Sequence, residues 1–449
     1  MRAIVDLQLP LDRGFVDHPR GVELRLMSET LDRCPEISRL AHSDLTRGRS
    51  STAGRPGLSG DQAVRVLVLK QLTGFSFEAL AFHLADSRSY RSFCRFGLGE
   101  KALRKSALQA TLSKLSPSTL REINDLLIQR VVEDGLDKGD KVRVDTTVTE
   151  SNIHYPTDSS LLWDSVRVLV RLMKQARTEL GLSFVFRDRT RASKRRVYKI
   201  NQARRQAKRL PHYRDLVRFC EKTVSAAKRL LNRLQTDAGE KHRRRLEHHI
   251  ELAERVIDQT RRRVWSGESV PAGEKVVSIF EEHTDVIVKG GREVEYGHKL
   301  CLTVGRSTLV FDCSIEDGAP ADSTLAIDSI RRLTAITGET PSQVAMDSGF
   351  SSVANLRELK GLGVSEVMFH RKKPLLDTSL MTSTPAIHKE LWRFRAGVEG
   401  CVSFLKRCFG LRRATWKGRT GFHRFIRASV LAANLLTVAR LDLRREAQR

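Results

Sequence analysis

The stretch Trp392-Arg-Phe-Arg395-Ala-Gly-Val-Glu399-Gly-Cys-Val-Ser-Phe-Leu-Lys406 carries the pattern that decides the fold. At about 100° per helical residue, the side chains of Arg395, Glu399 and Lys406 lie about −60°, −20° and −40° from Trp392. Apolar residues fall between about −80° and −160°, which is the face that a helix buries: Leu391, Phe394, Val398, Val402, Leu405 and Phe409. One carboxylate flanked by cations suits a site that holds metal ions and grips phosphates. The alternative is a surface helix with an i,i+4 Arg–Glu pair.

Two further carboxylates accompany short apolar strands. Asp145 lies in the strand-like run Lys141–Val148, and Asp347 follows the predicted strand 343–346 just before a glycine turn. Two carboxylates on strands and one on a helix are the parts of a two-metal phosphoryl-transfer site, whose Mg²⁺ ions lie about 3.5–4 Å apart. Mg²⁺ prefers oxygen ligands and keeps several waters, so three carboxylates suffice. Asp312 or Asp317, near another predicted strand end, could replace Asp347.

These segments resemble the insertion-sequence transposases of the DDE type, which have an RNase H-like catalytic core. The spacing Trp392-x2-Arg395-x3-Glu399-x6-Lys406 is similar to the Y-x2-R-x3-E-x6-K signature of one bacterial branch, with Trp in place of Tyr. The run from Asp145 through Asn152-Ile-His-Tyr-Pro-Thr-Asp-Ser159 resembles the first-Asp region of that branch, and Tyr296-Gly-His-Lys-Leu300 resembles a following core strand. The resemblance covers roughly residues 60–440.

The resemblance implies a catalytic triad of Asp145, Asp347 and Glu399 that holds two Mg²⁺ ions, for which Mn²⁺ can substitute. One ion would activate water and later a DNA 3′-hydroxyl, and the other would stabilise the leaving oxygen. Arg395 would give a phosphate a bidentate grip, and Lys406 would act as a point charge. Trp392 would stack on an unpaired base or simply anchor the edge of the core.

The implied partner is double-stranded DNA, both transposon ends and target, bound by a homodimer. Two other functions fit the same residues. One is a catalytically inactive DNA-binding regulator derived from a transposase, and the other is a metal-dependent DNA nuclease without strand transfer. The sequence does not separate them, because water and a 3′-hydroxyl would use the same site.

Composition sets broad limits. The 449 residues carry a net charge of +26 with a pI of about 10.3, which favours a polyanionic partner. The seven cysteines form no CxxC pair and no metal-type spacing with histidine, so reduced thiols and a cytoplasmic location are expected. No apolar run approaches 18 residues, so we expect no membrane span.

The predicted fold class is α/β. An RNase H-like mixed sheet with helices is interrupted by a long basic helical insertion and preceded by an all-α N-terminal domain. Residues 1–60 form an N-terminal segment and linker. Residues 61–140 form a helical, helix-turn-helix-like DNA-binding domain that begins at a capping box of Ser59 and Gln62 and turns at Gly74 before Ser76. Residues 141–441 form the catalytic domain, with the insertion at 160–270.

The insertion carries most of the excess charge. Residues 167–265 hold 29 Lys/Arg and 10 Asp/Glu, a balance of +19, in long helices with a turn at 237–239. Asp158 is expected to cap a helix that starts at Ser160. A solvated coiled coil is possible, but so strong a bias favours contact with the DNA backbone. The expected contacts are Arg243, Arg244, Arg245, Arg261, Arg262 and Arg263.

The remaining core alternates between strands and helices. Strands are predicted at 275–280, 299–304, 308–314, 343–346 and 364–370, and helices at 322–333 and 351–360. A loop at 371–388 precedes the helix of Glu399. A basic loop at 410–421 supplies the further DNA-binding candidates Arg412, Arg413 and Lys417, and a helix at 422–441 ends the domain.

Overall fold

The computed structural model describes residues 4, 14–48, 57–97, 99–100, 103–234, 239–289, 293–370 and 377–448. The chain divides into two compact units. The first combines residues 1–151 with residues 298–449, and the second consists of residues 152–297. No helix in these described ranges is long and apolar enough to cross a membrane.

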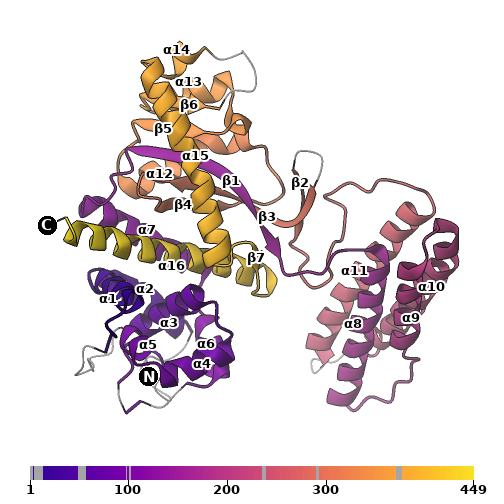
Figure 1. Cartoon of the computed structure of the whole chain (residues 1–449). Helices are drawn as coiled ribbons and strands as arrows, with labels where there is room; N and C mark the ends of the chain where they lie inside the picture. The colour runs from indigo at the N-terminus through magenta and orange to yellow at the C-terminus, as the bar shows by residue number, and fades with distance from the viewer. Residues whose placement is uncertain are drawn as a thin grey trace. The chain divides into compact units, whose positions relative to one another are not determined.

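The chain forms a seven-stranded mixed sheet of order β2-β3-β1-β5-β6, in which β4 pairs with β3 and β7 pairs with β1 (Figure 1). The pairs of β1 with β5, β5 with β6 and β1 with β7 are parallel, and the pairs of β3 with β2 and β4 are antiparallel. This confirms the predicted fold class, because the layout is consistent with an RNase H-like domain. The strands are β1 (Lys141–Ser151), β2 (Asp285–Lys289), β3 (Glu293–Val304), β4 (Val310–Ile315), β5 (Gln343–Met346), β6 (Glu366–Phe369) and β7 (Arg413–Ala414).

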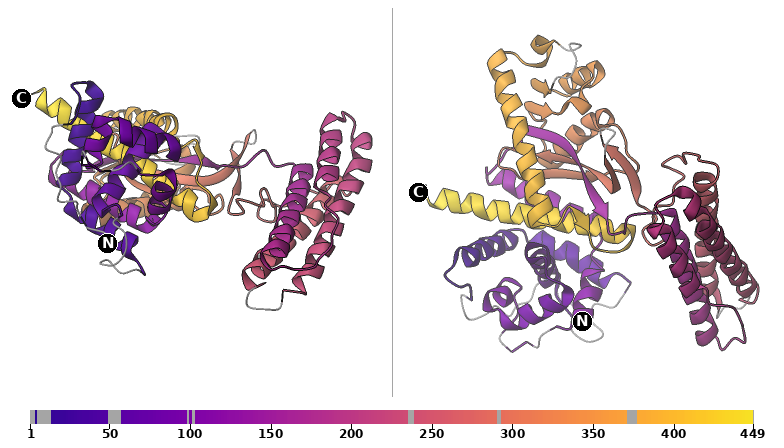
Figure 2. Two further views of the ribbon diagram at one scale, coloured as in Figure 1. Left: turned by 90° about the horizontal axis from the view of Figure 1, so that it is seen from below. Right: turned by 45° about the vertical axis from the view of Figure 1, so that its right-hand side comes forward.

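Helices of the first unit pack on this sheet and on one another. α15 packs against β1, β5 and β6, whereas α12 packs against β4 and α7, and α16 packs against β4, α7, α3 and α1 (Figures 1 and 2). The predicted loop at 371–388 is wrong at its end, because Thr384 caps a helix that Pro385 starts; residues 371–376 lie outside the described ranges. These helices are α12 (Asp322–Thr337), α13 (Val353–Gly361), α14 (Thr378–Met381), α15 (Pro385–Cys408) and α16 (Gly418–Glu446).

The N-terminal region is helical, as predicted. Ser59 and Gln62 form the capping box of α3, and Gly74 ends that helix with a left-handed φ of 67°, which glycine adopts without strain. Ser76 then caps α4. The helices are α1 (Pro19–Asp32), α2 (Pro35–Thr46), α3 (Gly60–Thr73), α4 (Phe77–Asp86), α5 (Arg88–Phe93), α6 (Lys105–Leu112) and α7 (Pro117–Glu133). Their buried side chains belong to the same apolar core as those of the sheet and α16.

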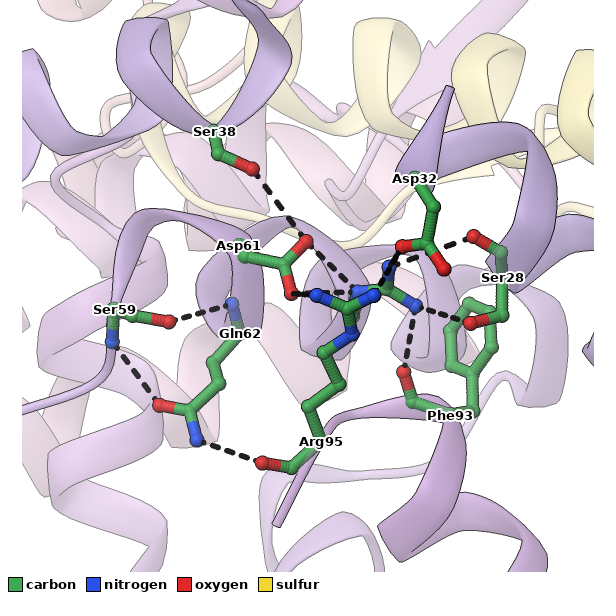
Figure 3. Close-up of polar contacts among 9 residues, drawn as sticks. Ser28, Asp32, Ser38, Ser59, Asp61, Gln62, Phe93 and Arg95 are labelled. Carbon is green, nitrogen blue, oxygen red and sulfur yellow. Dashed lines mark hydrogen bonds and ion pairs between the residues drawn. The ribbon is translucent and has the colours of Figure 1, made fainter. Parts of the chain in front are cut away.

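A buried arginine joins three of the N-terminal elements. The Arg65 side chain is fully buried in α3, and its Nε donates to both carboxylate oxygens of Asp61, at 2.8 and 2.9 Å. Nη2 donates to Asp32 of α1 at 2.5 Å, and Nη1 donates to the Ser28 hydroxyl at 2.7 Å and the Phe93 carbonyl at 3.1 Å (Figure 3). The planar fork of donors therefore fixes α1, α3 and the end of α5 together.

The second unit has a helical core of its own, formed by α8 (Asp158–Glu179), α9 (Thr190–Gln202), α10 (Gln206–Leu231) and α11 (Glu240–Val264). The strand predicted at 275–280 is wrong. Val276 and Ile279 instead pack on the helical core from an irregular segment, and local alternation of apolar residues does not distinguish this role from a strand. Asp158 is not a helix cap, because Thr157 caps α8. The predicted turn at 237–239 falls mostly outside the described residues.

We predict that Arg65→Met destabilises the first unit by about 3 kcal/mol or more, because it leaves the buried Asp61 carboxylate with only its longer contacts, to Arg95 at 3.4 Å and to the Ser38 hydroxyl at 3.5 Å. Urea unfolding followed by circular dichroism measures the loss. The matched control is Arg25→Met, which removes an exposed i,i+4 pair with Glu29 and should cost less than about 0.5 kcal/mol. Equal losses in the two variants would contradict a structural role for the Arg65 network.

Candidate active site

Parallel pairing of β1 and β5 brings Asp145, in the middle of β1, beside Asp347, which directly follows β5. Val144 pairs with Met346, so the next residue along the chain in each segment is an aspartate. Val142, Val144 and Met346 are fully buried, and this anchors the strands beneath the two carboxylates. The Asp145 side chain is 18% exposed and that of Asp347 is 37% exposed. Both carboxylates are therefore accessible to a ligand.

One cationic nitrogen faces both carboxylates. Arg395 of α15 places Nη2 3.6 Å from Asp145 Oδ2 and 3.5 Å from Asp347 Oδ1. These distances are ion pairs rather than good hydrogen bonds. The Arg395 Nε is buried and has no hydrogen-bond partner among the described residues, so within them this guanidinium has an unused donor. The geometry shows that the two carboxylates converge on one cation-binding position.

Contacts with β1 hold α15 at this position. Arg143 Nη1 donates to the Phe394 carbonyl at 2.8 Å, and its guanidinium stacks on the Phe394 ring at 4.7 Å from the centroid. Gly397 allows this approach, because a Cβ there would lie 2.2 Å from Arg143 Nη1. A small apolar cluster completes the contact, formed by Ala345, Met368 and Leu391 with Ile387 and Phe394 against it.

Burial raises the pKa of Asp145 above its usual value. The Thr146 backbone N–H, which donates to Asp145 Oδ1 at 2.7 Å, and the Arg395 charge oppose this shift. The negative charges of Asp347 and Asp322 reinforce it. Because crowded, partly buried carboxylates disfavour their own ionised form, a bound cation would stabilise this site.

The sequence reasoning missed Asp322, whose carboxylate lies beside the site at the start of α12. Its Oδ1 accepts hydrogen bonds from the Thr146 hydroxyl at 3.1 Å and from Lys299 Nζ at 3.0 Å. A Cβ on Gly349, two residues after Asp347, would lie 2.7 Å from Asp322 Oδ2. The available signal was an acidic first turn in a helix that follows a predicted core strand, but the same signal marks ordinary helix starts.

Glu399 does not join the two aspartates in this arrangement. It lies on α15 one turn beyond Arg395 and is exposed. Within the described ranges, no group of three or more His, Cys, Asp and Glu side chains is placed to hold a metal ion. The oxygen donors of Asp145 and Asp347 nevertheless suit a hard divalent cation, because they already face one cationic nitrogen.

The other residues of the helical stripe lie along α15. The Trp392 side chain is 50% exposed, and its ring stacks on that of His370 with centroids 6.3 Å apart. Lys406 is half-buried in the last turn of the helix. Asp312 and Asp317, the alternatives to Asp347, are engaged elsewhere: Asp312 pairs with Arg332 at 2.6 Å, and Asp317 pairs with Arg419 at 2.5 Å.

The basic candidates outside α15 differ in how their charges are neutralised. Arg412 and Lys417 are exposed, whereas Arg413 pairs with Glu150 across the β1–β7 contact at 2.5 Å. In the second unit, five of the six expected arginines are in ion pairs, and Arg245 is half-buried. Arg243 and Arg244 pair with Glu240, Arg261 pairs with Glu221, Arg262 pairs with Glu268 and Glu274, and Arg263 pairs with Asp158.

Comparison with known proteins identifies transposase domains. A family model described as "Transposase DDE domain" matches residues 284–435, and one described as "Transposase domain (DUF772)" matches residues 16–114. The first match includes Asp347, Arg395 and Glu399, whereas Asp145 lies between the two matches. A stretch of 147 residues is 28% identical to "Uncharacterized protein ORF8 in nfe locus" of Rhizobium meliloti, covering 32% of this chain and 69% of that protein. No solved structure matches the chain.

We predict opposite effects of alanine at two glycines of α15. Gly400→Ala should stabilise the first unit by about 0.5–1 kcal/mol, because nothing lies within 4 Å of a Cβ there and alanine favours a helix. Gly397→Ala should destabilise it by about 1 kcal/mol, because displacing the Arg143 guanidinium outweighs the same helical gain. Urea unfolding of both variants checks this. Equal stabilisation would show that α15 does not depend on its close approach to Arg143.

Proposed function

The chain belongs to the insertion-sequence transposases of the DDE type, and we propose that it cuts DNA at transposon ends and joins them to target DNA. DDE transposases as a family act on DNA and generally use divalent metal ions. The observation that carries the proposal is the convergence of Asp145 and Asp347, on adjacent parallel strands, around one cationic nitrogen. Such a point suits a phosphoryl-transfer site, where charge neutralisation and positioning provide most of the catalysis.

Asp145, Asp347 and Glu399 are the residues that would hold two Mg²⁺ ions or, in their place, Mn²⁺. The chemistry supplied there would be activation of the attacking oxygen and stabilisation of the leaving oxygen. Glu399 is one helical turn from Arg395 on α15. A small rotation or shift of this helix would therefore move both side chains, and it could bring Glu399 toward Asp145 and Asp347. We therefore propose that Glu399 completes the triad in the DNA complex.

Arg395 would exchange its carboxylate contacts for a DNA phosphate. Its buried Nε has no acceptor in the part of the chain that the structure describes, and a phosphate oxygen would satisfy that donor as part of a bidentate contact. Removing the guanidinium from between Asp145 and Asp347 would also leave their charges for metal ions. We propose that Trp392, which is half exposed beside His370, stacks on an unpaired base near the cut.

The remaining assignments concern DNA contact and assembly. We propose that Lys406, Arg412 and Lys417 contact the DNA backbone near the cut. The two lysines would act as point charges, and the guanidinium of Arg412 would donate paired hydrogen bonds to a phosphate. We also propose that a homodimer forms in the DNA complex and that it holds two transposon ends for joining to one target.

We predict that the wild-type protein cleaves end DNA with Mg²⁺ or Mn²⁺, and that Asp145→Ala, Asp347→Ala and Glu399→Ala lose cleavage. The reason is that each variant removes an oxygen ligand of the metal ions. Gel mobility in EDTA should show unchanged DNA binding for all three variants, which separates lost chemistry from lost folding. Full cleavage by purified Asp347→Ala protein would refute the assignment.

The same experiment separates the two competing functions. An inactive DNA-binding regulator would show no cleavage by the wild type with any divalent metal. A nuclease without strand transfer would cut but would not join a precut end to supercoiled plasmid. Joined products that are absent from Glu399→Ala reactions would support transposition.

We predict that Arg395→Ala binds Mn²⁺ in the absence of DNA as tightly as the wild type or several-fold more tightly, because a competing cation has left the carboxylates. Cleavage at the specific end should nevertheless weaken by about 1.5–3 kcal/mol, the contribution of a charge-assisted contact. Arg395→Lys should restore only part of it, since a point charge lacks the fork. Mn²⁺ titration and end cleavage on the same preparations check both effects. Normal cleavage with a lowered melting temperature would make Arg395 a purely structural residue.

A further inference from the structure

One segment of the second unit concentrates positive charge without any acidic residue. Residues 189–214 contain 11 Lys/Arg and no Asp or Glu. The segment comprises α9, the short connection after it and the first turns of α10. α9 packs beside α8 and α10, so only part of its surface is buried (Figure 1).

The direction of the α9 side chains follows from the helical period. Ser193 and Ile200 are buried toward the neighbouring helices. Relative to Arg191, the side chains on the other side fall between about −60° and +80°. Together with exposed cations after the helix they form what we call the α9 face: Arg191, Lys194, Arg195, Tyr198, Lys199, Arg204, Arg205 and Lys208, all of which are exposed.

The cations of the α9 face have no carboxylate partner among the described residues. Other exposed cations of the same unit do: Lys174 pairs with Asp188 at 2.7 Å, and Lys228 pairs with Glu254 at 2.6 Å. Arg196, inside the same helix but half-buried, pairs with Asp215 at 2.9 Å. The charge of the α9 face is therefore not neutralised by carboxylates among the described residues. By contrast, most of the α11 arginines that the sequence predicted to bind DNA are neutralised by ion pairs.

Neighbouring positive charges add to the effect of burial on the pKa values of two groups in this unit. At the start of α9, burial lowers the pKa of Arg189, and the nearby positive charges of Arg187 and Arg229 lower it further. On α11, burial lowers the pKa of His249 to about 4, with help from the charges of His248, Arg245 and Arg171. Like charges held this close are stabilised when a polyanion binds.

We propose that the α9 face is the surface by which the second unit binds the phosphate backbone of duplex DNA, without reading its sequence. This inference rests on the proposed function and specifies where the insertion contacts its partner. α9 is about 20 Å long, a length over which duplex DNA presents on the order of ten phosphates. Tyr198, 65% exposed at the centre of the face, offers a hydroxyl that can donate to a phosphate oxygen.

The test compares two variants that each remove two lysines and one arginine from the full-length protein. One is Lys194→Gln/Arg195→Gln/Lys199→Gln on the α9 face. The other is Lys174→Gln/Arg196→Gln/Lys228→Gln, which removes cations already paired with carboxylates. Fluorescence anisotropy with a random-sequence duplex, in EDTA, measures affinity against salt concentration. Circular dichroism and melting temperature establish that both variants fold.

We expect the α9 variant to make the negative slope of log K against log salt shallower by up to about 2.7, or roughly 0.9 per lost phosphate contact. We also expect it to weaken DNA binding about tenfold or more. The paired-cation variant should retain most of the wild-type slope. Equal losses would overturn the proposal, because they would show that only net charge matters.

Vesicles of phosphatidylserine and phosphatidylcholine provide the second comparison. Loss of vesicle binding without loss of DNA binding would assign the face to a membrane and also overturn the proposal.

Failure of this proposal is distinguishable from failure of the proposed function. The binding measurements contain no divalent metal and involve no cleavage. A wild-type protein that cleaves transposon ends while the α9 variant binds duplex DNA normally would refute the α9 face alone. A normal salt slope with no cleavage under any condition would refute the catalytic assignment and leave the α9 face standing.

Discussion

The contact between Arg143 and Phe394 is the constraint on which the site depends. Arg143 is a strand residue, and its guanidinium donates to a main-chain carbonyl of α15 while stacking on the neighbouring ring. Because burial lowers the pKa of Arg143 only from a very high value, the side chain stays charged at neutral pH. The next residue of α15, Arg395, is thereby fixed beside Asp145 and Asp347. The position of α15 is thus set by one cation beneath it.

A second cation, that of Arg395, balances the charge of the free site. Asp145, Asp347 and Asp322 contribute three carboxylates, and Arg395 and Lys299 contribute two cations that contact them. Such near-neutrality lets crowded carboxylates exist without bound metal. In the proposed function, a DNA phosphate and metal ions would each replace contacts that are already present. Binding of DNA and binding of metal would then be thermodynamically linked through Arg395. A phosphate that binds Arg395 would free the carboxylates for metal, and a metal that binds the carboxylates would free Arg395 for a phosphate.

Local patterns in the sequence predicted most of the fold and the core of the site. The helical stripe, the capping box at Ser59 and the strand segments that carry the two aspartates are each encoded by neighbouring residues, and parallel pairing then places Asp145 beside Asp347. Asp145 lies in the middle of β1 and not at a strand end as predicted, because the strand continues to Ser151. Asp322 was not predictable in this way, because its hydrogen bond to Thr146 joins residues 176 positions apart. The false strand at 275–280 has a similar cause: Val276 and Ile279 cover a helical core that only the folded chain assembles. A count of charges in the sequence likewise does not predict that Arg261 pairs with Glu221, because the two residues are 40 positions apart.

The place where the second unit leaves the sheet has a consequence for how such chains diversify. The helices α8 to α11 of the second unit lie in the sequence between β1 and β2, and they bury a core of their own. A change in the length or number of these helices leaves the strands of the sheet in place and alters no residue of the aspartate pair. Selection can therefore reshape the basic helical unit while the aspartate pair stays constant. The two are separable parts of one continuous gene.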